Sequence, residues 1–406
     1  MSLPTLRLPT GLEAALASRH PWVYRDHVPS GGALKDGAWV RVEAGRQSAV
    51  GLWADAGAIA VRLLRHAPAD APLAPPDAAW VEATVARALA LREALIPART
   101  DAYRLLFGEG DGLPGIVADR YGRFAVLKTY ADGYRRDGSD AQALLDQVRS
   151  ALTRALPLRG VLAAASDGGE VERAWGTAPP PELTVHEHGL RFLANLYEGQ
   201  KTGLFLDHRE HRALVRDVAR GRTVANLFAY NGAFSVYALA GGARRAVDVD
   251  LAPAALRDAE RNVAANRDAL GDDAPSRHAT LRADLLSDPA AALRAPALAG
   301  TDLIVLDPPS LARRKGQRHA ALRAYRRLNA AAMAALPEGG LLATASCTAQ
   351  VSAEAFQATL AEAALEAGVS AQLLHTSGHA ADHPLRTSFP EGRYLKFVLL
   401  RITRPA

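Results

Sequence analysis

An alternation of apolar, strand-like runs with amphipathic helical runs, beginning near residue 223, restricts the fold of this chain more than any other feature. Strands that alternate with helices of this length predict a parallel β-sheet with helices on both faces. The last two strand-like runs have only a loop between them, which predicts an antiparallel edge. The strands are expected at 223–228, 245–250, 278–284, 302–310, 341–347, 369–375 and 393–402, and the helices at 232–242, 253–267, 318–335 and 352–367.

Two further modules are expected ahead of that sheet. Short β-rich runs broken by turn residues predict a small N-terminal β-barrel. A Pro- and Ala-rich stretch (67–77) predicts a linker, and mixed helix and strand patterns then predict a central α+β region. The fold class is therefore α/β, with a C-terminal Rossmann-like sheet and domains expected at 1–71, 72–187 and 188–406. The β-rich runs are 36–45, 48–54 and 58–65, and the central elements are helices at 78–96 and 138–155 and strands within 103–131, 160–166 and 183–196.

Four glycines between residues 108 and 115 resemble a phosphate-binding loop. However, no Gly-Lys-Ser/Thr sequence follows them, and the next element is expected to be a strand rather than a helix. A tight hairpin whose glycines adopt positive φ is the better interpretation.

Composition excludes several other classes of protein. The one cysteine, Cys347, allows neither an internal disulfide nor a cysteine-rich zinc site, and no metal is expected. No segment approaches the ~18 apolar residues of a membrane helix, and the N-terminus lacks a secretory pattern, so a cytoplasmic protein is expected. The net charge is +5, and all but five of the basic residues are arginine. Arginine suits a phosphate-bearing partner, although a GC-rich genome would give the same bias.

Residues at the carboxyl ends of the expected strands indicate a nucleoside cofactor, because ligands of open α/β sheets bind at that edge. Asp250 ends the second strand, where an acidic side chain accepts hydrogen bonds from ribose hydroxyls. The turn after the first strand (229–232) holds one glycine, Gly232, whereas a dinucleotide needs a glycine-rich turn for its pyrophosphate. S-adenosylmethionine has no phosphate, so the pattern favours it over NAD. A purely structural βαβ unit is the alternative.

Two motifs at neighbouring strand ends suggest chemistry on a nucleobase. In DPPS (307–310), Asp307 follows an apolar strand, and two prolines fix a rigid turn that projects its carboxylate. Such a carboxylate binds a ring nitrogen or exocyclic amine, and a solvated Asp is the alternative. Cys347, between Ser346 and Thr348, ends the next strand, where a thiolate would attack a base. The alternative is a buried cysteine that only packs.

Basic and aromatic residues suggest contact with RNA. Trp22 and Arg25 lie in a run that interleaves aromatic and basic residues, a pattern suited to stacking and pairing on RNA. Alternatively, the aromatic residues are spaced as in a β-strand and only pack in the core. A second, basic group follows DPPS and would line the rim of the site, where positive charge attracts a polyanion. A solvated surface is the alternative for this rim, whose members are Arg313, Arg314, Lys315 and Arg318.

Six motifs occur in a fixed order: GEGDGLPGIVADRYG, GQKTGLFLDHREHR, NLFAYNGAFSVYAL, VLDPPS, ATASCT and ADHP…FPEGRYLK. In this order, and over essentially its whole length, the chain resembles the RlmI-type family of ribosomal RNA cytosine-C5 methyltransferases. The resemblance implies an N-terminal PUA domain, a central α+β domain and a C-terminal class I methyltransferase domain that uses S-adenosylmethionine. It also implies large-subunit ribosomal RNA as the partner, and a homodimer is compatible with it.

The resemblance further implies roles for individual residues. Cys347 would be the nucleophile that adds to cytosine C6, and Asp307 would hold the N3/N4 edge of the base. Many RNA cytosine-C5 enzymes carry a second cysteine after the Asp-Pro pair, but Ser310 follows Pro309 here, so product release cannot use a second thiol. The cofactor would be held by Lys201, Thr202, Phe228, Tyr230, Asn231, Gly232, Asp250, Leu251, Asp284, Leu285, Asp307 and Pro308.

Three other functions remain open at this point. A methyltransferase acting on a different atom, such as a guanine nitrogen, would also carry Asp-Pro-Pro but would need no thiol. A non-catalytic RNA-binding or ribosome assembly factor would keep the fold without binding S-adenosylmethionine. A small-molecule methyltransferase would leave the two additional domains and the arginine-rich rim without a role.

Overall fold

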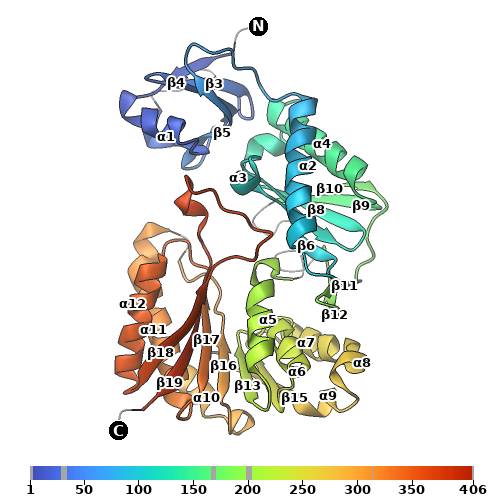
Figure 1. Ribbon diagram of the computed structural model, residues 1–406, viewed down its shortest axis with the longest axis vertical. Helices are drawn as coiled ribbons and strands as arrows, with labels where there is room; N and C mark the ends of the chain where they lie inside the picture. Colours follow the sequence, from blue (N-terminus) through green and yellow to red (C-terminus); the bar gives the residue numbers. More distant parts are fainter. Residues whose placement is uncertain (1–2, 29–33, 166–170, 198–203, 313, 405–406) are drawn as a thin grey trace. The chain divides into compact units, whose positions relative to one another are not determined.

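The structure, a computed structural model, describes residues 3–28, 34–165, 171–197, 204–312 and 314–404. Two compact units make up the chain, and each is assembled from separate stretches of sequence (Figure 1). Unit 1 comprises Met1–Leu183, Ala194–Gly203 and Ala381–Gly392, and unit 2 comprises Thr184–Leu193, Leu204–Ala380 and Arg393–Ala406. Because these units interleave along the chain, the ranges 1–71, 72–187 and 188–406 stay a proposed division into sequence modules.

The N-terminal part of unit 1 is a five-stranded sheet of order β1-β3-β4-β5-β2. Strands β3, β4 and β5 pair antiparallel in the three β-rich runs, and β1 adds to β3 in parallel. Alternate residues of β3 enter the core, and Val40 and Val42 are fully buried. The elements are β1 (Thr5–Arg7), α1 (Glu13–Ala17), β2 (Trp22–Tyr24), β3 (Trp39–Ala44), β4 (Gln47–Trp53) and β5 (Ile59–Pro68).

The second part of unit 1 is a sheet of order β10-β9-β8-β7-β6, which shares one apolar core with helices α2 and α4. Both helices begin at side-chain caps: Asp77 accepts the Trp80 N–H at 2.8 Å, and Ser139 accepts the Gln142 N–H at 3.0 Å. Strand β10 was not expected, because most of its residues are exposed and its sequence lacks apolar alternation. The elements are α2 (Ala78–Leu95), β6 (Ala102–Phe107), β7 (Ile116–Tyr121), β8 (Phe124–Thr129), α4 (Asp140–Ala155), β9 (Gly160–Ala165) and β10 (Val171–Gly176).

Strands β6 and β7 pair antiparallel, so the hairpin predicted at the glycine-rich turn is confirmed, but it is not tight, because a helical turn, α3 (Gly108–Asp111), lies in its loop. The Asp111 carboxylate accepts the Phe107 N–H at 2.6 Å, which closes this turn. The expectation of positive φ is confirmed at Gly112, where φ is 87°. A side-chain hydrogen bond across four residues thus favours a helical turn within the loop of this hairpin.

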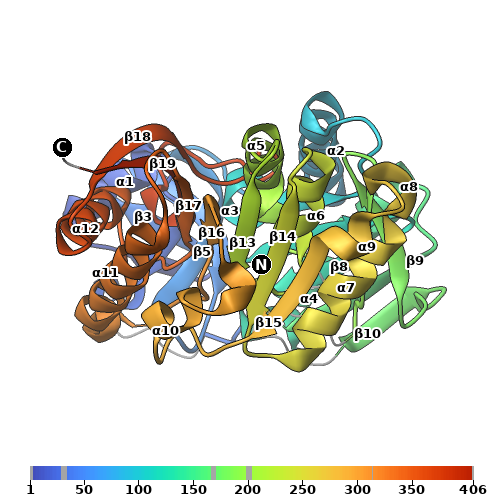
Figure 2. The ribbon, with the colours of Figure 1, turned by 90° about the horizontal axis from the view of Figure 1, so that it is seen from below.

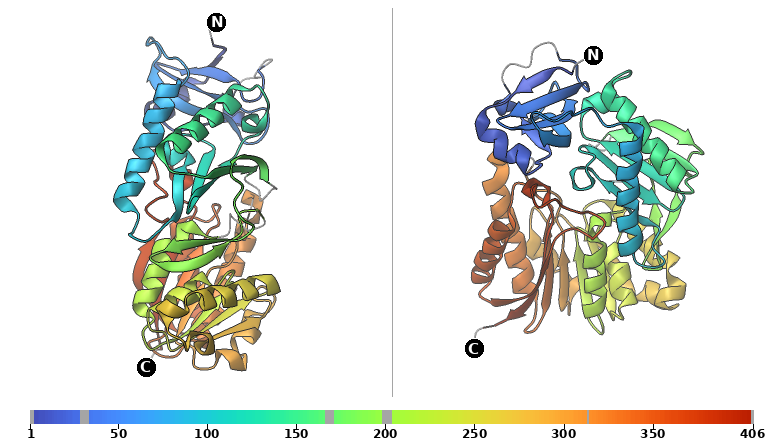
Figure 3. Two further views of the ribbon diagram at one scale, coloured as in Figure 1. Left: turned by 90° about the vertical axis from the view of Figure 1, so that its right-hand side faces the viewer. Right: turned by 45° about the horizontal axis from the view of Figure 1, so that its top comes forward.

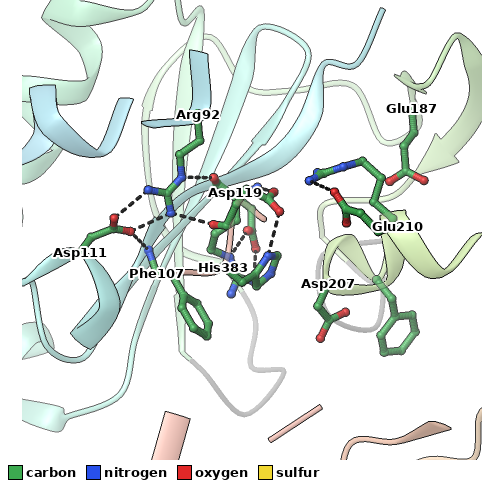
Figure 4. A network of polar contacts seen from close by, with 12 residues as sticks. Arg92, Phe107, Asp111, Asp119, Glu187, Asp207, Glu210 and His383 are labelled. Atoms are coloured by element: carbon green, nitrogen blue, oxygen red, sulfur yellow. Dashed lines mark hydrogen bonds and ion pairs between the residues drawn. The ribbon is translucent and has the colours of Figure 1, made fainter. Parts of the chain in front are cut away.

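Residues 381–392 come from late in the sequence, yet they belong to unit 1. Arg92, buried on α2, forms two 2.7 Å bonds with the Asp111 carboxylate and donates to the Asp382 backbone oxygen at 2.7 Å (Figure 4). The Asp382 carboxylate in turn accepts the Arg104 N–H at 2.7 Å. In the right-hand view of Figure 3 the same segment, in red, reaches the blue N-terminal strands. A late segment therefore completes the polar core of unit 1.

Unit 2 contains a seven-stranded sheet of order β15-β14-β13-β16-β17-β19-β18. Strands β13 to β17 pair in parallel, and β19 lies antiparallel between β17 and β18, so the predicted parallel sheet with an antiparallel edge is confirmed. Helices α5, α6 and α7 form one group and α10, α11 and α12 another, with the sheet between them (Figure 2). The strands are β13 (Thr223–Leu227), β14 (Arg245–Asp250), β15 (His278–Arg282), β16 (Leu303–Leu306), β17 (Leu341–Ser346), β18 (Ser370–Ser377) and β19 (Lys396–Thr403). The helices are α5 (Arg209–Val218), α6 (Ala233–Ala240), α7 (Pro253–Ala265), α8 (Arg267–Leu270), α9 (Ala274–Arg277), α10 (Pro289–Leu293), α11 (Arg318–Ala335) and α12 (Ala353–Glu366).

A buried ion pair attaches the hairpin of β11 (Leu183–Glu187) and β12 (Leu190–Ala194) to α5. Glu187 is fully buried and accepts two hydrogen bonds from Arg212, at 2.8 and 2.7 Å. It also accepts the Tyr237 hydroxyl at 2.9 Å, and burial raises the pKa of that phenol, which keeps it a donor. Leu193 N–H donates to the Asn262 side chain at 2.8 Å, so the hairpin is also tied to α7.

Candidate active site

The loop that follows β13 has an unusual backbone. Phe228, Tyr230 and Gly232 all adopt left-handed conformations, with φ of 57°, 49° and 72°. For the two aromatic residues this costs about 1–3 kcal/mol each and persists only where the surroundings impose it, typically at ligand sites. Gly232 admits no side chain, because a Cβ there would lie 2.6 Å from both the Ala259 Cβ and the Asp248 carboxylate. The loop is therefore fixed at the carboxyl edge of the sheet.

Two aspartates of β14 hold this loop in place. Asp250 accepts the N–H groups of Tyr230 and Ala252 at 3.0 and 2.9 Å, and each of its oxygens keeps a second lone pair for a ligand. Asp248, which the sequence analysis missed, is fully buried and accepts three side-chain hydrogen bonds. Their donors lie on different elements, so no local sequence signal could have revealed them. They are Asn226, Ser235 and His278, at 2.7, 2.6 and 2.7 Å.

The expected cofactor residues beyond this loop differ in exposure. Leu251, directly after Asp250, is 54% exposed and presents an apolar surface beside that carboxylate. Asp284 is exposed, and a hydrogen bond from the Ser287 hydroxyl, supported by backbone N–H groups, lowers its pKa. Leu285 is buried within the core of unit 2. Asp284 thus caps a turn, and Leu285 packs beneath it.

The structure brings Asp307 and Cys347 to the same edge of the sheet, because they follow the parallel neighbours β16 and β17. The half-buried Cys347 Sγ lies 3.9 Å from the carbonyl oxygen of the buried Pro308. Thr348 joins the two turns, since its hydroxyl accepts the Leu311 N–H at 3.0 Å. The thiol therefore lies against the DPPS turn.

Lys396, at the start of β19, is a residue that the sequence analysis did not single out. It is buried and pairs across the sheet with Ser346, the neighbour of Cys347. Its ammonium donates to the carbonyl oxygens of Thr348 and Tyr394 at 2.7 and 2.9 Å. Burial lowers the pKa of Lys396 to about 8, and the interaction with Cys347 opposes this shift. The same interaction, seen from the sulfur, favours the thiolate.

His208 is a second residue that was not singled out. Its Nε2 lies 3.3 Å from Asp307 Oδ2, and its Nδ1 lies 2.9 Å from Nδ1 of His211. Both imidazoles are buried. His208 belongs to the motif GQKTGLFLDHREHR (199–212). The expected cofactor residues Lys201 and Thr202 of that segment lie outside the described residues.

Trp22 and Arg25, the N-terminal residues expected to meet RNA, are engaged within unit 1. Trp22 Nε1 donates to Glu109 at 2.7 Å, and its ring packs edge-on against Phe389 with centroids 4.5 Å apart. The Arg25 guanidinium donates to the Gly57 carbonyl at 2.8 Å. These contacts give both residues a structural role, and contact with RNA stays a prediction.

The expected basic rim is described only in part. Arg314 and Arg318 are exposed, and Arg318 is the first residue of α11. Arg313 and the side chain of Lys315 lie outside the described residues. The rim therefore stays a prediction that rests on two exposed arginines close to DPPS in the sequence.

Among the residues that the structure describes, no group of three or more His, Cys, Asp or Glu side chains could hold a metal ion. Within the same ranges no helix is long and apolar enough to cross a membrane. At the edge of the sheet, the carboxylates of Asp248 and Asp250 accept hydrogen bonds from protein groups.

Lys396→Met is expected to slow alkylation of Cys347 by iodoacetamide at pH 7 severalfold, because the thiolate is the reactive form. The physical reason is the loss of the ammonium charge beside the thiolate. Because the pKa of Lys396 is about 8, the difference between wild type and variant should shrink above pH 8. The measurement is the mass of the intact protein over time, which is simple in a chain with one cysteine.

Lys128→Met, in unit 1, provides the matched control for this experiment, and thermal unfolding checks that both variants fold. Equal alkylation rates for wild type and Lys396→Met at pH 7 would show that Lys396 only packs β19 against β17.

Comparison with known proteins gives a consistent result. Residues 170–376 match a family described as S-adenosylmethionine-dependent methyltransferase, and residues 6–66 match a PUA-like domain. A ribosomal RNA large subunit methyltransferase of Deinococcus radiodurans is 37% identical, with 99% of this chain and 98% of that protein aligned. The ribosomal RNA large subunit methyltransferase I of Shewanella amazonensis is 36% identical, over 98% of this chain and 99% of that protein.

Solved structures share the fold. SMU.776, assigned as a methyltransferase and crystallised in complex with SAH, superposes with a TM-score of 0.82 at 22% identity, covering 98% of this chain and 100% of that one. A structure from Streptococcus mutans, assigned as a SAM-dependent methyltransferase, gives a TM-score of 0.78 at 20% identity, with 98% and 100% covered. At identities of 22% and 20%, these superpositions show that this chain and the two solved structures share a fold.

Proposed function

The chain belongs to the S-adenosylmethionine-dependent methyltransferase family that includes the ribosomal RNA large subunit methyltransferases named above, and from this premise we propose that it methylates C5 of a cytosine in large-subunit ribosomal RNA. S-adenosylmethionine supplies an electrophilic methyl group on a sulfonium. The observation that carries the proposal is the position of the Cys347 thiol against the DPPS turn. A base-methylating enzyme needs a nucleophile at this place only when the target carbon must first be activated.

The loop after β13 fits a nucleoside cofactor. Asp250 has lone pairs for the two ribose hydroxyls, and the exposed Leu251 offers an apolar face to adenine. Asn231 is buried, and its carbonyl accepts the Asn262 amide at 2.8 Å, which fixes the floor of the loop. Lys201 and Thr202, which lie outside the described residues, are proposed for the pocket from the sequence resemblance alone. The remaining pocket residues are a proposal that rests on their place at this edge: Phe228, Tyr230, Gly232, Asp284, Leu285, Asp307 and Pro308.

Cys347 would overcome the weak nucleophilicity of cytosine C5. Its thiolate forms a bond to C6, the C5=C6 electrons shift through C4 to N3, and N3 takes up a proton. C5 then has enamine character and bonds to the methyl carbon, while the C–S electron pair of the sulfonium leaves with S-adenosylhomocysteine. N3 gives its proton back and water takes the C5 proton. The electron pair of the C5–H bond restores the C5=C6 bond, and the C6–S pair leaves with Cys347 as its thiolate. The product is 5-methylcytosine and a regenerated thiolate.

Two other side chains have roles in this step. Asp307 would hold the N3/N4 edge of the base, where charge changes as the C6–S bond forms. Lys396 would stabilise the thiolate before attack, because its ammonium is buried, where solvent screens its interaction with Cys347 little.

Support for a ribosomal RNA substrate comes from the named relatives and from the PUA-like match. The exposed Arg314 and Arg318 suit contact with phosphates. The target base must be exposed or flipped into the site, at a cost of a few kcal/mol, which phosphate contacts would offset. This substrate would also place the enzyme in the cytoplasm.

The test is methyl transfer from labelled S-adenosylmethionine to unmodified ribosomal RNA, followed by digestion to nucleosides and identification by mass. Label in 5-methylcytidine is the expected result. Label in a methylguanosine would replace the proposal with methylation at a guanine nitrogen, which needs no thiol. Failure to bind S-adenosylmethionine would instead favour a non-catalytic RNA-binding or assembly factor.

A further inference from the structure

Tyr325 is a buried phenol that the proposed reaction does not use. It lies on α11, within the apolar core of unit 2, and it is fully buried. We propose that Tyr325 is a positioning residue for Cys347: its hydroxyl, acting through the Thr348 hydroxyl, holds the turn that carries the thiol against the DPPS turn. This inference rests on the proposed function, but the link between the two turns belongs to the free protein and is tested separately.

The Tyr325 hydroxyl meets the chain directly beside the thiol. Its oxygen lies 2.7 Å from Oγ1 of Thr348, the residue after Cys347, and Thr348 is fully buried. Burial raises the pKa of Tyr325, so the phenol keeps its proton at neutral pH. Whichever of the two hydroxyls donates, the bond fixes the position of Thr348 Oγ1.

Thr348 connects the two turns that the reaction brings together. Its Oγ1 also accepts the N–H of Leu311, which directly follows DPPS, at 3.0 Å. Its carbonyl oxygen accepts the Lys396 ammonium at 2.7 Å and the Val351 N–H at 3.0 Å. Thr348 is thus held through its carbonyl by groups on its own side of the turn, and through its hydroxyl by Tyr325 of α11.

The core fixes the place of the Tyr325 hydroxyl. The ring packs edge-on against Phe356 of α12, with centroids 5.4 Å apart, and both residues are fully buried. Helix α11 packs against β16 and β17, the strands that lead to the two turns. A ring enclosed in a close-packed interior has no room for another rotamer. Phenylalanine would fill the same space, so packing alone does not require the hydroxyl.

The link matters because Cys347 and Asp307 must reach the same base. Cys347 Sγ lies 3.9 Å from the Pro308 carbonyl oxygen, so the place of the thiol relative to Asp307 depends on how the two turns are aligned. A displacement of 1 Å in a site can lower the rate about 10²-fold. Tyr325 restrains Thr348, and Thr348 binds the chain after DPPS. The phenol therefore sets this alignment without touching the base.

The first experiment measures hydrogen exchange of the Leu311 amide by ¹⁵N NMR in the protein without RNA. Tyr325→Phe keeps the ring and removes the hydroxyl, so Thr348 Oγ1 is less restrained and the Leu311 amide should exchange severalfold faster. Thr348→Val removes the acceptor itself and should accelerate the exchange further. An unchanged Leu311 rate in Tyr325→Phe would contradict the link between the two turns.

The second experiment measures single-turnover methyl transfer at saturating S-adenosylmethionine and RNA. Tyr325→Phe should be about tenfold slower, less than the cost of a 1 Å displacement because the ring stays in place. Affinities for both substrates should stay unchanged. Alkylation of Cys347 by iodoacetamide at pH 7 should not slow, because a neutral phenol does not set the thiolate fraction.

Tyr134→Phe is the matched control. It also removes a buried tyrosine hydroxyl, which donates to the Pro114 carbonyl at 2.6 Å in unit 1, and it should keep the wild-type rate of methyl transfer. Thermal unfolding checks that both variants fold.

Variants of Thr348 show whether Tyr325 acts through this residue. Thr348→Ser keeps a hydroxyl and should retain most of the rate, whereas Thr348→Val should lose about 10²-fold. Adding Tyr325→Phe to Thr348→Val should cost nothing further, because residues that act through one chain of contacts are not additive. A further tenfold loss in the double variant would contradict action through Thr348.

The outcomes separate this inference from the proposed function. Equal rates of methyl transfer in Tyr325→Phe and Tyr134→Phe, or a loss confined to RNA or cofactor binding, would contradict the role of Tyr325 while 5-methylcytidine still forms. Absence of 5-methylcytidine with wild-type enzyme contradicts the proposed function, and the exchange rates of Leu311 still decide whether Tyr325 holds the two turns together.

Discussion

Replacing Cys347 with alanine is expected to lower the rate of methyl transfer to ribosomal RNA by at least about 10⁴-fold, the order of loss seen when an essential nucleophile is removed. Without the thiolate, C5 of cytosine keeps its weak nucleophilicity, and nothing else in the chain can replace a thiol, because Cys347 is the only cysteine. The measurement is label in 5-methylcytidine after a single turnover. Binding of S-adenosylmethionine should be unchanged, since the loop after β13 does not depend on this side chain.

Cys347→Ser is the matched variant, because it keeps the size of the side chain and a polar atom near the Pro308 carbonyl. A serine hydroxyl is not ionised near neutral pH, so this variant should be as inactive as the alanine variant. If either variant retained most of the wild-type rate, Cys347 would be a packing residue, and the enzyme would act on an atom that needs no activation.

Arg212→Met is expected to lower the free energy of unfolding of unit 2 by about 3–5 kcal/mol, the cost of leaving one partner of a buried ion pair alone. Arg212 and Glu187 are both buried, and methionine cannot supply the two N–H groups that Glu187 accepts. Urea unfolding followed by circular dichroism measures the effect.

The double variant Arg212→Met/Glu187→Leu separates the charge from the packing. When both partners are apolar, no carboxylate is left uncompensated, so the double variant should be more stable than Arg212→Met alone. A double variant less stable than the single one would mean that Glu187 contributes chiefly through the Tyr237 hydroxyl, which it also accepts.

The sequence predicts the sheet of unit 2 well, because most of its strands are short apolar runs separated by helical runs. The helix expected at 318–335 agrees with α11. Strand ends then place Asp250, Asp307 and Cys347 at one edge without any knowledge of side-chain contacts. The exposed strand β10 was missed because its place in the sheet, and not an apolar pattern, makes it a strand. The helical turn α3 was missed because one hydrogen bond to the Asp111 carboxylate stabilises it.

The residues that tune the site were harder to predict. Lys396 lies opposite Ser346, the neighbour of Cys347, only because β19 pairs antiparallel with β17, and the register of this pair is not visible in the sequence. His208 approaches Asp307 from a segment about 100 residues earlier, so neither residue signals the other. The motif FPEGRYLK contains Lys396, and a lysine that follows apolar and aromatic residues at a strand start was the one available signal.

The interleaving of the two units has a consequence for biosynthesis. The chain passes between the units five times, and the Asp382 carbonyl that Arg92 requires is translated 290 residues after it. When a nascent chain has emerged past α4, Arg92 is already outside the ribosome. The Asp382 carbonyl oxygen to which it donates in the folded protein has not yet been translated. Closing so long a loop costs chain entropy that local contacts cannot offset early. Most of unit 1 leaves the ribosome first, but its polar core cannot be completed before residues 381–392 have been translated.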